Sequence, residues 1–212
     1  MPMIKSSKSV KREYPTEEEI KKFFYHRKVG TLSNSGYFMN VYPPAQVKVR
    51  FKEGPMHGVD KADSYIINVP WHVFSALLYF SDRSVILKKC NLFFFNEEPK
   101  SIDHVPCYAS LPNIHDSSKI CFGSYRPSYR AKVDRYLLHL HRNFWLSTFT
   151  SDIGVNTDAI PEGLDYKYHE RDLRWVNLGR YMRALAKAAK DDVKLKWRMM
   201  PEKMEYYLRS PW

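Results

Sequence analysis

Apolar and aromatic residues gather in three runs in the first half of the chain, and these runs predict a β-sheet. They cover residues 65–69, 73–80 and 85–95, and they are rich in the β-branched and aromatic residues that favour strands. The run 73–80 also fits a buried helix, because a short apolar run does not reveal its period, and the strand is the preferred interpretation. Residues 37–41 and 47–51 are predicted to be extended, and Pro43 and Pro44 exclude a helix between them.

Two further segments carry the signals of amphipathic helices. Thr16, followed by glutamates at 17–19, forms a capping-box arrangement that predicts a short helix continuing through Phe24. The clearest helix of the chain is predicted from Val133 onward, with Ser128 as its N-cap. Its apolar residues recur at helical spacing: Val133, Tyr136, Leu137, Leu140 and Phe144.

Another amphipathic helix is predicted near the C-terminus and ends at Pro201. Its apolar positions are Leu178, Met182, Leu185 and Ala189. A basic stripe recurs on it at spacings of three and four: Arg180, Arg183, Lys187, Lys190 and Lys194. Such a stripe either follows a phosphate backbone, with Trp175, Tyr181 and Trp197 available for stacking, or is an ordinary solvated helix face. Both interpretations stay open.

The order of these elements predicts an α+β domain. Residues 97–128 show little periodicity, and a loop of this length in a compact domain is often functional. We expect a flexible basic arm at 1–15, a core domain at 16–170 and a C-terminal basic amphipathic helix and tail at 171–212. The α+β fold as a whole is predicted to contain a short N-terminal helix, an antiparallel meander, the long loop and two or three packed C-terminal helices.

Composition and charge narrow the class of protein. The chain has 212 residues, of which 44% are hydrophobic and 15% aromatic, so it can bury a core without cross-links. No apolar run approaches the roughly 20 residues of a bilayer span, and the first residues lack the apolar stretch of a signal peptide. We therefore expect a soluble cytoplasmic protein. A net charge of +11 predicts attraction to nucleic acid or an acidic partner, or simply general solvation.

Cysteine and histidine spacings argue against a metal site. Cys90, Cys107 and Cys121 cannot all pair within one chain, and no C-x-x-C spacing occurs. We expect free thiols in a reducing compartment, with Cys90 and Cys107 in structural roles. His139 and His141 are two positions apart on the predicted helix and face different sides. No metal and no other cofactor is predicted.

Residues 111–123 read Leu-Pro-Asn-Ile-His-Asp-Ser-Ser-Lys-Ile-Cys-Phe-Gly. They resemble the active-site segment of ubiquitin-conjugating enzymes, in which a Pro-Asn-Ile turn precedes, by eight positions from the Asn, the Cys of an Ile-Cys pair. The same spacing separates Asn113 from Cys121. The segment is also similar to the prokaryotic family D of ubiquitin-conjugating-like proteins, which includes PRTRC-system protein B. The stretch 144–150 resembles a later motif of that family, and the resemblance covers residues 65–151.

The resemblance implies a ubiquitin-conjugating-like fold and a thioester chemistry. Cys121 would accept a ubiquitin-like C-terminus as a thioester and pass it to an amine, while Asn113 supports the oxyanion. Acyl transfer of this kind needs a nucleophile and an amide donor at a fixed distance. The implied partners are a ThiF-type activating enzyme and a ubiquitin-like protein, in a bacterial, plasmid or phage setting. Further residues are expected to line the site: Pro112, His115, Asp116, Lys119 and Gly123.

Each of these residues also has a purely structural interpretation. Cys121 is either the nucleophile or a packed core thiol, and Asn113 either supports an oxyanion or caps its own turn. His115 and Lys119 either raise the thiolate fraction or are solvated loop residues. Relative to the eukaryotic enzymes, Leu111 replaces a histidine, and the 118–119 pair replaces a glycine. The alternative function is a non-catalytic structural or nucleic-acid-binding component of a virion or nucleoprotein assembly.

Overall fold

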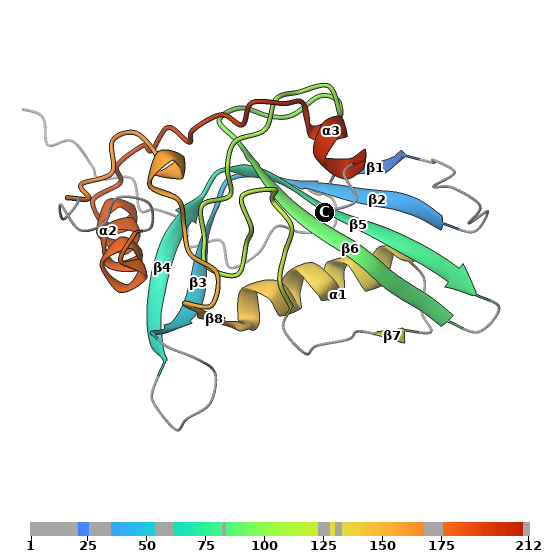
Figure 1. Cartoon of the computed structure of the whole chain (residues 1–212), viewed down its shortest axis with the longest axis horizontal. Coiled ribbons are helices and arrows are strands. Elements are labelled where there is room, and N and C mark those ends of the chain that lie inside the picture. Colours follow the sequence, from blue (N-terminus) through green and yellow to red (C-terminus); the bar gives the residue numbers. More distant parts are fainter. Residues whose placement is uncertain are drawn as a thin grey trace, which may run out of the picture.

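A computed structural model of the chain describes residues 21–25, 35–53, 62–81, 84–122, 128–129, 133–167 and 176–209. Its strands are β1 (Lys21–Tyr25), β2 (Ser35–Tyr42), β3 (Ala45–Lys52), β4 (Asp63–Val69), β5 (Trp71–Ser81), β6 (Ser84–Phe95), β7 (Ser128–Tyr129) and β8 (Thr148–Thr150). Its helices are α1 (Val133–Leu146), α2 (Leu178–Lys190) and α3 (Met204–Arg209), with a 3₁₀ turn, η1 (Thr157–Ala159). One sheet has the order β1-β2-β5-β6-β7 and the other β4-β3-β8 (Figure 1). The predicted α+β class is confirmed.

Two long strands form one bent antiparallel ribbon that belongs to both sheets. β2 continues into β3 past Pro43 and Pro44, and β4 continues into β5 past Pro70 (Figure 1). The register is the same on both sides of the bend: Ser35 pairs with Tyr79, Tyr42 with His72, Ala45 with Val69, and Phe51 with Asp63. Proline has no backbone N–H to donate to a ladder, so the prolines mark the point at which the two sheets divide.

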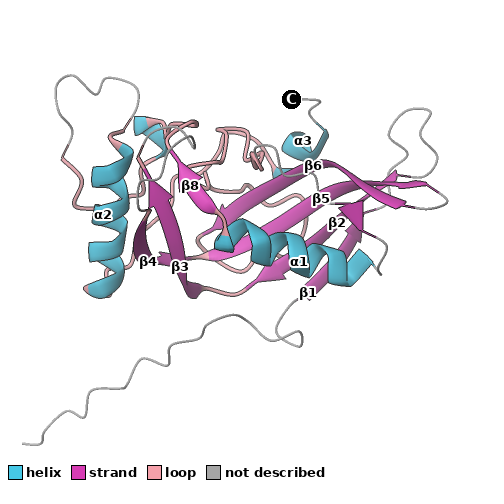
Figure 2. Ribbon diagram, turned by 90° about the horizontal axis from the view of Figure 1, so that it is seen from below, coloured by secondary structure: helices cyan, strands magenta, loops and turns pink. Residues whose placement is uncertain are grey.

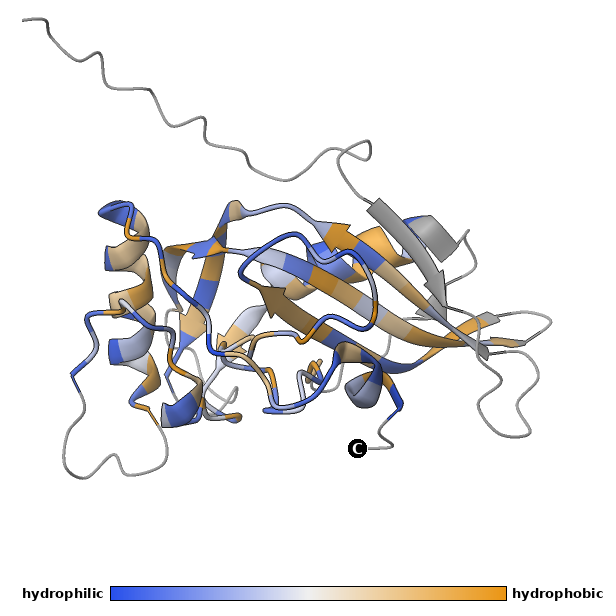
Figure 3. Ribbon diagram, turned by 90° about the horizontal axis from the view of Figure 1, so that it is seen from above, coloured by the Kyte–Doolittle hydropathy of each residue, from blue (hydrophilic) through white to orange (hydrophobic). Residues whose placement is uncertain are grey.

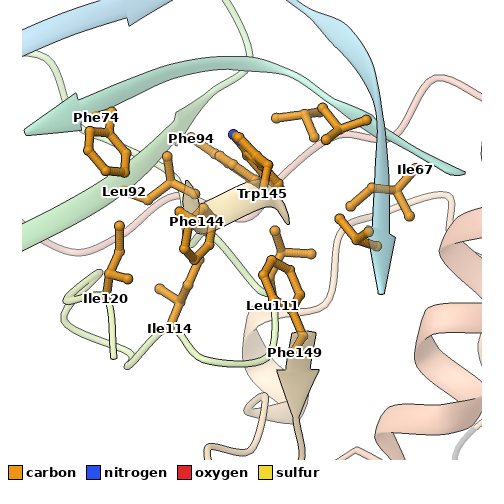
Figure 4. Close-up of a cluster of buried hydrophobic side chains, with 14 of the residues drawn as sticks. Ile67, Phe74, Leu92, Phe94, Leu111, Ile114, Ile120, Phe144, Trp145 and Phe149 are labelled. Carbon is orange, nitrogen blue, oxygen red and sulfur yellow. The ribbon is translucent and has the colours of Figure 1, made fainter. Parts of the chain in front are cut away.

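The central part of the larger sheet is buried on both faces, and apolar residues recur along its strands (Figure 3). Phe74 packs against Phe144 of α1 (Figure 4), whereas Phe93 lies on the opposite face near Tyr207 of α3. A strand covered on both faces reads as a continuous apolar run, which explains why residues 73–80 show no alternation. The preferred strand interpretation of this run is confirmed, and the helix alternative is wrong. The other predicted strands lie within β2, β3, β4 and β6.

The smaller sheet is buried on one face only. In β3, Val47 and Val49 are buried while Lys48 and Arg50 are exposed, so the strand alternates with a period of two. The buried face belongs to the same core as Met182 and other apolar residues of α2. The opposite face of this sheet is open to solvent.

A buried aromatic cluster holds α1 against the bend of the ribbon. His72 Nδ1–H donates to the Pro70 carbonyl at 3.0 Å, and its Nε2 lies 3.0 Å from Nε2 of His141. Trp145 Nε1 donates to the same His141 nitrogen at 2.9 Å, and Tyr42 stacks on the His141 ring. Burial lowers the pKa of His72 to about 4 and lowers the pKa of His141 as well, so both rings are neutral near pH 7.

Side chains from the larger sheet cap the C-terminal end of α3. Lys89 Nζ donates to the Tyr207 carbonyl at 2.7 Å, and the Tyr37 hydroxyl donates to the Leu208 carbonyl. A cation at this end complements the helix dipole. Burial, together with the nearby Lys119 cation, lowers the pKa of Lys89 to about 8.

Two predicted features near helix starts are wrong. Phe23 and Phe24 lie in strand β1, which pairs with β2, so pairing with a sheet edge overrides the local capping-box signal. Residues 16–20 and the predicted arm at 1–15 lie outside the described residues. Ser128 is not an N-cap, because it pairs with Ile86 as part of β7 and α1 begins only at Val133.

The predicted end of the C-terminal helix is also wrong. α2 ends at Lys190 with Asp191 as its C-cap, and Asp192 turns the chain away with φ of 53°. Pro201 therefore does not terminate this helix, and Lys194 is not part of it. In the described part of the chain, three helices follow the long loop, which agrees with the predicted two or three. Among the described residues, no helix is both long and apolar enough to span a membrane.

Candidate active site

Asn113 and Cys121 lie opposite each other on a small hairpin within the long loop. Ile114 and Ile120 form an antiparallel bridge, and the Cys121 backbone N–H donates to the Asn113 carbonyl at 2.8 Å. The spacing of eight positions seen in the sequence is therefore the spacing of cross-strand neighbours. The structure brings the backbones of the predicted nucleophile and of the predicted amide donor together.

This hairpin is fixed to the edge of the larger sheet. The Ile120 N–H donates to the Cys90 carbonyl at 2.8 Å, and the Leu92 N–H donates to the Ser118 carbonyl at 2.9 Å. Ile114 and Ile120 point into the core beside Phe144 and Leu92 (Figure 4). Cys121 thus directly follows a strand-like segment whose position is set by β6.

The hairpin turn contains a residue in the left-handed region. Ser118 has φ of 62°, and its N–H donates to the His115 carbonyl at 2.7 Å. Glycine takes this conformation at the lowest cost, and the ubiquitin-conjugating pattern has a glycine in this part of the segment. Ser118 is buried, and its hydroxyl donates to Sδ of Met200 at 3.3 Å. The hairpin closes even though the glycine is replaced.

Contacts with β8 hold the Asn113 side chain in place. Asn113 Oδ1 accepts from the Thr150 N–H at 3.2 Å, and Nδ2 donates to the Thr148 carbonyl at 3.5 Å. The Thr150 hydroxyl donates to Asp152 Oδ2 at 2.8 Å and also lies 3.2 Å from Asn113 Oδ1. An asparagine amide carries two N–H groups, and the contact with Thr148 uses one of them.

These contacts show that Asn113 does not simply cap its own turn, which was the structural alternative. Its φ of 66° is in the left-handed region, which asparagine tolerates better than most residues. Sequence reasoning missed Thr148, Thr150 and Asp152 as neighbours of the site. Thr148 and Thr150 are 35 and 37 positions from Asn113, and no spacing rule joins residues so far apart.

The three cysteines differ sharply in environment. Cys121 is exposed, while Cys90 and Cys107 are buried. Burial raises the pKa of Cys90 well above its usual value and that of Cys107 to about 11, so both stay protonated thiols. The core-thiol interpretation is wrong for Cys121, and the burial expected of structural cysteines is confirmed for the other two.

The remaining predicted site residues lie around the hairpin. Pro112 is buried directly before Asn113, whereas His115, Asp116 and Lys119 are exposed. His115 and Asp116 line a shallow hollow formed with residues 154–156. No residue in the described part of the chain hydrogen-bonds the Cys121 thiol, and Gly123 lies outside that part. Lys119 stands near Lys89, where it helps to lower the pKa of the Lys89 amine.

The basic stripe of α2 is present but partly neutralised. Arg180, Arg183, Lys187 and Lys190 are exposed, and Lys187 forms an ion pair with Asp165 at 3.0 Å. Tyr181 and Trp197 are buried, so the prediction that they stack on bases is wrong. Trp175 lies outside the described residues. The nucleic-acid role of the stripe stays a prediction.

His139 is exposed and His141 is buried, so the prediction that they face different sides is confirmed. Within the described ranges, no three His, Cys, Asp or Glu side chains form a group that could hold a metal ion. Comparison with known proteins finds no matching family model, no matching curated protein and no matching solved structure. A functional proposal for this chain therefore depends on the geometry of its own residues.

Proposed function

We propose that the protein is a ubiquitin-conjugating-like carrier that holds a ubiquitin-like protein as a thioester on Cys121 and passes it to an amine. The observation that supports this most is the cross-strand pair of an exposed thiol and an anchored amide, Cys121 and Asn113. The order of elements is compatible with the same proposal. An antiparallel meander of β1, β2, β5 and β6 precedes the loop with the hairpin, and α1, α2 and α3 follow it.

The chemistry has two steps. In the first, the Cys121 thiolate attacks the carbonyl carbon of the activated tail, the new C–S bond forms, and the thiolate of the activating enzyme leaves. In the second, an amine attacks the thioester carbon, and the negative charge collects on the carbonyl oxygen. Collapse of this intermediate forms the amide, expels the Cys121 thiolate and releases the amine proton to water.

Asn113 has its role in the second step. Its second N–H is the donor for the oxyanion, and the contacts of its Oδ1 with Thr150 fix the amide before the reaction begins. A donor fixed in advance needs no reorganisation when charge develops, and removal of such a donor typically slows a reaction about 100- to 1,000-fold. The Thr150 hydroxyl also donates to Asp152, so this carboxylate is linked to the Asn113 amide through one intervening residue.

A loading and discharge assay tests the proposal with a synthetic acyl donor in place of the natural partners. A peptide ending in Gly-Gly, supplied as the thioester of a small thiol, is exchanged onto the protein, and intact mass follows the acyl group. Free lysine is then added, and the rate of amide formation is compared with that of the same acyl group on N-acetylcysteine. We expect loading at Cys121 and discharge faster than from the free thioester.

The variant Asn113→Asp keeps the contact with the Thr150 N–H and removes the amide N–H groups. Aspartate still accepts from the Thr150 N–H and tolerates a positive φ, but it has no N–H to offer to an oxyanion or to the Thr148 carbonyl. Loading should persist while discharge falls about 100-fold. Cys121→Ser should lose the exchangeable thioester altogether. Discharge from the natural protein no faster than from N-acetylcysteine, or an Asn113→Asp variant as fast as the natural protein, would contradict the proposal.

A further inference from the structure

Two elements on one side of the molecule present basic side chains to solvent. Lys48 and Arg50 project from the open face of β3, and Arg135 and Arg142 project from the exposed side of α1. These four residues are called the basic face below. None of them has an ion-pair partner among the described residues.

Both groups point away from one shared core. Val47 and Val49, on the buried face of β3, belong to the same core as Phe144 of α1. The cations on the opposite face of β3 and on the exposed side of α1 therefore lie on the outside of that core. Figure 2 shows this side, with α1 in front and β3 and β4 beyond one of its ends.

Only a short segment of chain connects the helix that carries one group to the sheet that carries the other. α1 leads through Ser147 into β8, and Thr148 at the start of β8 pairs with Arg50. The exposed or half-exposed neighbours of Lys48 and Arg50 on the open face are uncharged: Gln46, Ser64, Ile66 and Asn68. A carboxylate, that of Asp152, stands at the rim, where it accepts from Thr150.

The basic stripe on α2, in contrast to the basic face, lies close to carboxylates. Lys187 is paired with Asp165, and Asp191 and Asp192 follow directly at the end of the helix. The hydroxyl of Tyr65 interacts with Arg183 and with Asp63. Carboxylates therefore offset part of the charge of α2, whereas the four cations of the basic face are uncompensated by ion pairs within the described ranges.

We infer that the basic face binds the phosphodiester backbone of nucleic acid. Lys48 and Arg50 are about 7 Å apart along the strand, and Arg135 and Arg142 are about 10 Å apart along the helix. Contacts with phosphates need spread positive charge and little else. A stable protein partner usually needs a central aromatic or aliphatic anchor. The large apolar side chains described as exposed beside these cations are Ile66 of the neighbouring strand β4 and Leu146 at the end of α1.

This arrangement predicts binding without sequence preference. The described exposed residues of the basic face and its neighbours include no Phe, Tyr or Trp to stack on a base, so duplex DNA should bind at least as well as a single strand. The inference does not depend on Cys121, and the two proposals can succeed or fail separately.

Salt dependence measures the number of phosphates that the face neutralises. The full chain is titrated into a fluorescein-labelled random duplex of about 30 base pairs, and anisotropy is read at several salt concentrations. Four phosphate contacts predict a slope of log affinity against log salt of about −3.6, which is roughly a 150-fold loss between 50 and 200 mM salt. The same titration is made with Lys5, Lys8, Lys11 and Arg12 changed to Gln, which removes the contribution of the N-terminal basic residues.

Paired neutralisations locate the binding surface. In the background without the N-terminal charges, Lys48→Gln with Arg50→Gln, and separately Arg135→Gln with Arg142→Gln, should each reduce the slope by about 1.8 and weaken binding about 10-fold. The matched control, Arg180→Gln with Arg183→Gln on α2, removes the same charge and should change affinity less than about two-fold. All three pairs are exposed, so thermal unfolding should be unchanged.

Three results would overturn the inference. The first is the absence of salt-dependent DNA binding, and the second is a loss of binding in the α2 control with no loss in the basic-face pairs. The third is tighter binding of polyglutamate of equal charge than of the duplex, which would assign the face to an acidic protein. Ser substitution of Cys121 should leave DNA binding unchanged.

Discussion

The two halves of the bent ribbon have different surroundings. The half formed by β2 and β5 is covered by α1 on one face and by α3 on the other, whereas the half formed by β3 and β4 is covered on one face only. Phe74, Ala76 and Leu78 of the first half are fully buried, and Val49 of the second half is equally buried on its covered face. The second half exposes charge to solvent, and its partner strand β8 holds Asn113. The two ends of the same pair of strands therefore differ in which of their faces are buried and which are open to solvent.

The strongest test of this difference compares one residue from each half. Phe74 is fully buried against Phe144 and His141, so Phe74→Ala should lower the free energy of unfolding by about 3–5 kcal/mol. Ile66, on the open half, is 48% exposed, and Ile66→Ala should change it by less than about 1 kcal/mol. Urea unfolding with a constant m-value measures both. Similar losses in the two variants would mean that the open face is covered.

Acid should weaken the bend of the ribbon. The pKa of His72 is about 4 in the folded protein and about 6.5 when unfolded, so the unfolded chain binds the proton more readily. Its contribution to stability is complete above pH 6.5 and is lost as the pH falls towards 4, amounting to about 3 kcal/mol. Neighbouring Tyr42, His141 and Trp145 supply no carboxylate to offset a charge on this ring.

Unfolding by urea at pH 7, 6, 5 and 4.5 measures this loss, and His72→Phe serves as the comparison. The variant should show a smaller decline, with the remainder due to His141, whose pKa is also lowered by burial. A natural protein whose stability is flat between pH 6.5 and 4.5 would show that the two histidines are not buried as neutral rings.

The hairpin turn should accept glycine and reject a branched residue. Ser118 holds a φ of 62°, so Ser118→Gly relieves strain but loses the contact with Met200, and the net change should stay within about 1 kcal/mol. Ser118→Val adds branched bulk at a buried left-handed position and should cost about 2 kcal/mol or more. If valine is tolerated as well as glycine, the turn has a different conformation in solution.

The smallest effect on stability is expected in the open half. Lys48→Gln with Arg50→Gln removes two exposed cations that have no described ion-pair partner, so the free energy of unfolding should change by less than about 0.5 kcal/mol. Thermal unfolding checks this value, and a marked destabilisation would show that these side chains support the fold rather than a ligand.

The positions of the strands could be predicted from the sequence better than which of their faces are buried and which segments pair with them. The alternation in β3 is visible in the residues themselves, because one face is open. The run 73–80 hides its period, because Val73 and Phe74 are both buried on opposite faces. The capping box before Phe23 predicted a helix that the neighbouring sheet edge replaced with β1, and local signals cannot anticipate such pairing.

The candidate site was predictable where it is local. Asn113 and Cys121 belong to one hairpin, so their spacing is visible within thirteen consecutive residues of the sequence. The anchoring of Asn113 by Thr148 and Thr150 depends on how α1 returns the chain to β3, which no local pattern encodes. Exposure of Cys121 was left open for the same reason, since burial is a property of the whole fold.

Differential alkylation tests most directly the claim that the reactive chemistry of this chain lies at Cys121. The native protein is treated with iodoacetamide at near-neutral pH, and mass spectrometry follows the occupancy of each cysteine. Because Cys121 is exposed while burial raises the pKa of the other two, Cys121 should react at least about 100-fold faster. Cys90 and Cys107 should react only after unfolding in urea. Equal protection of all three cysteines in the native protein would contradict the account.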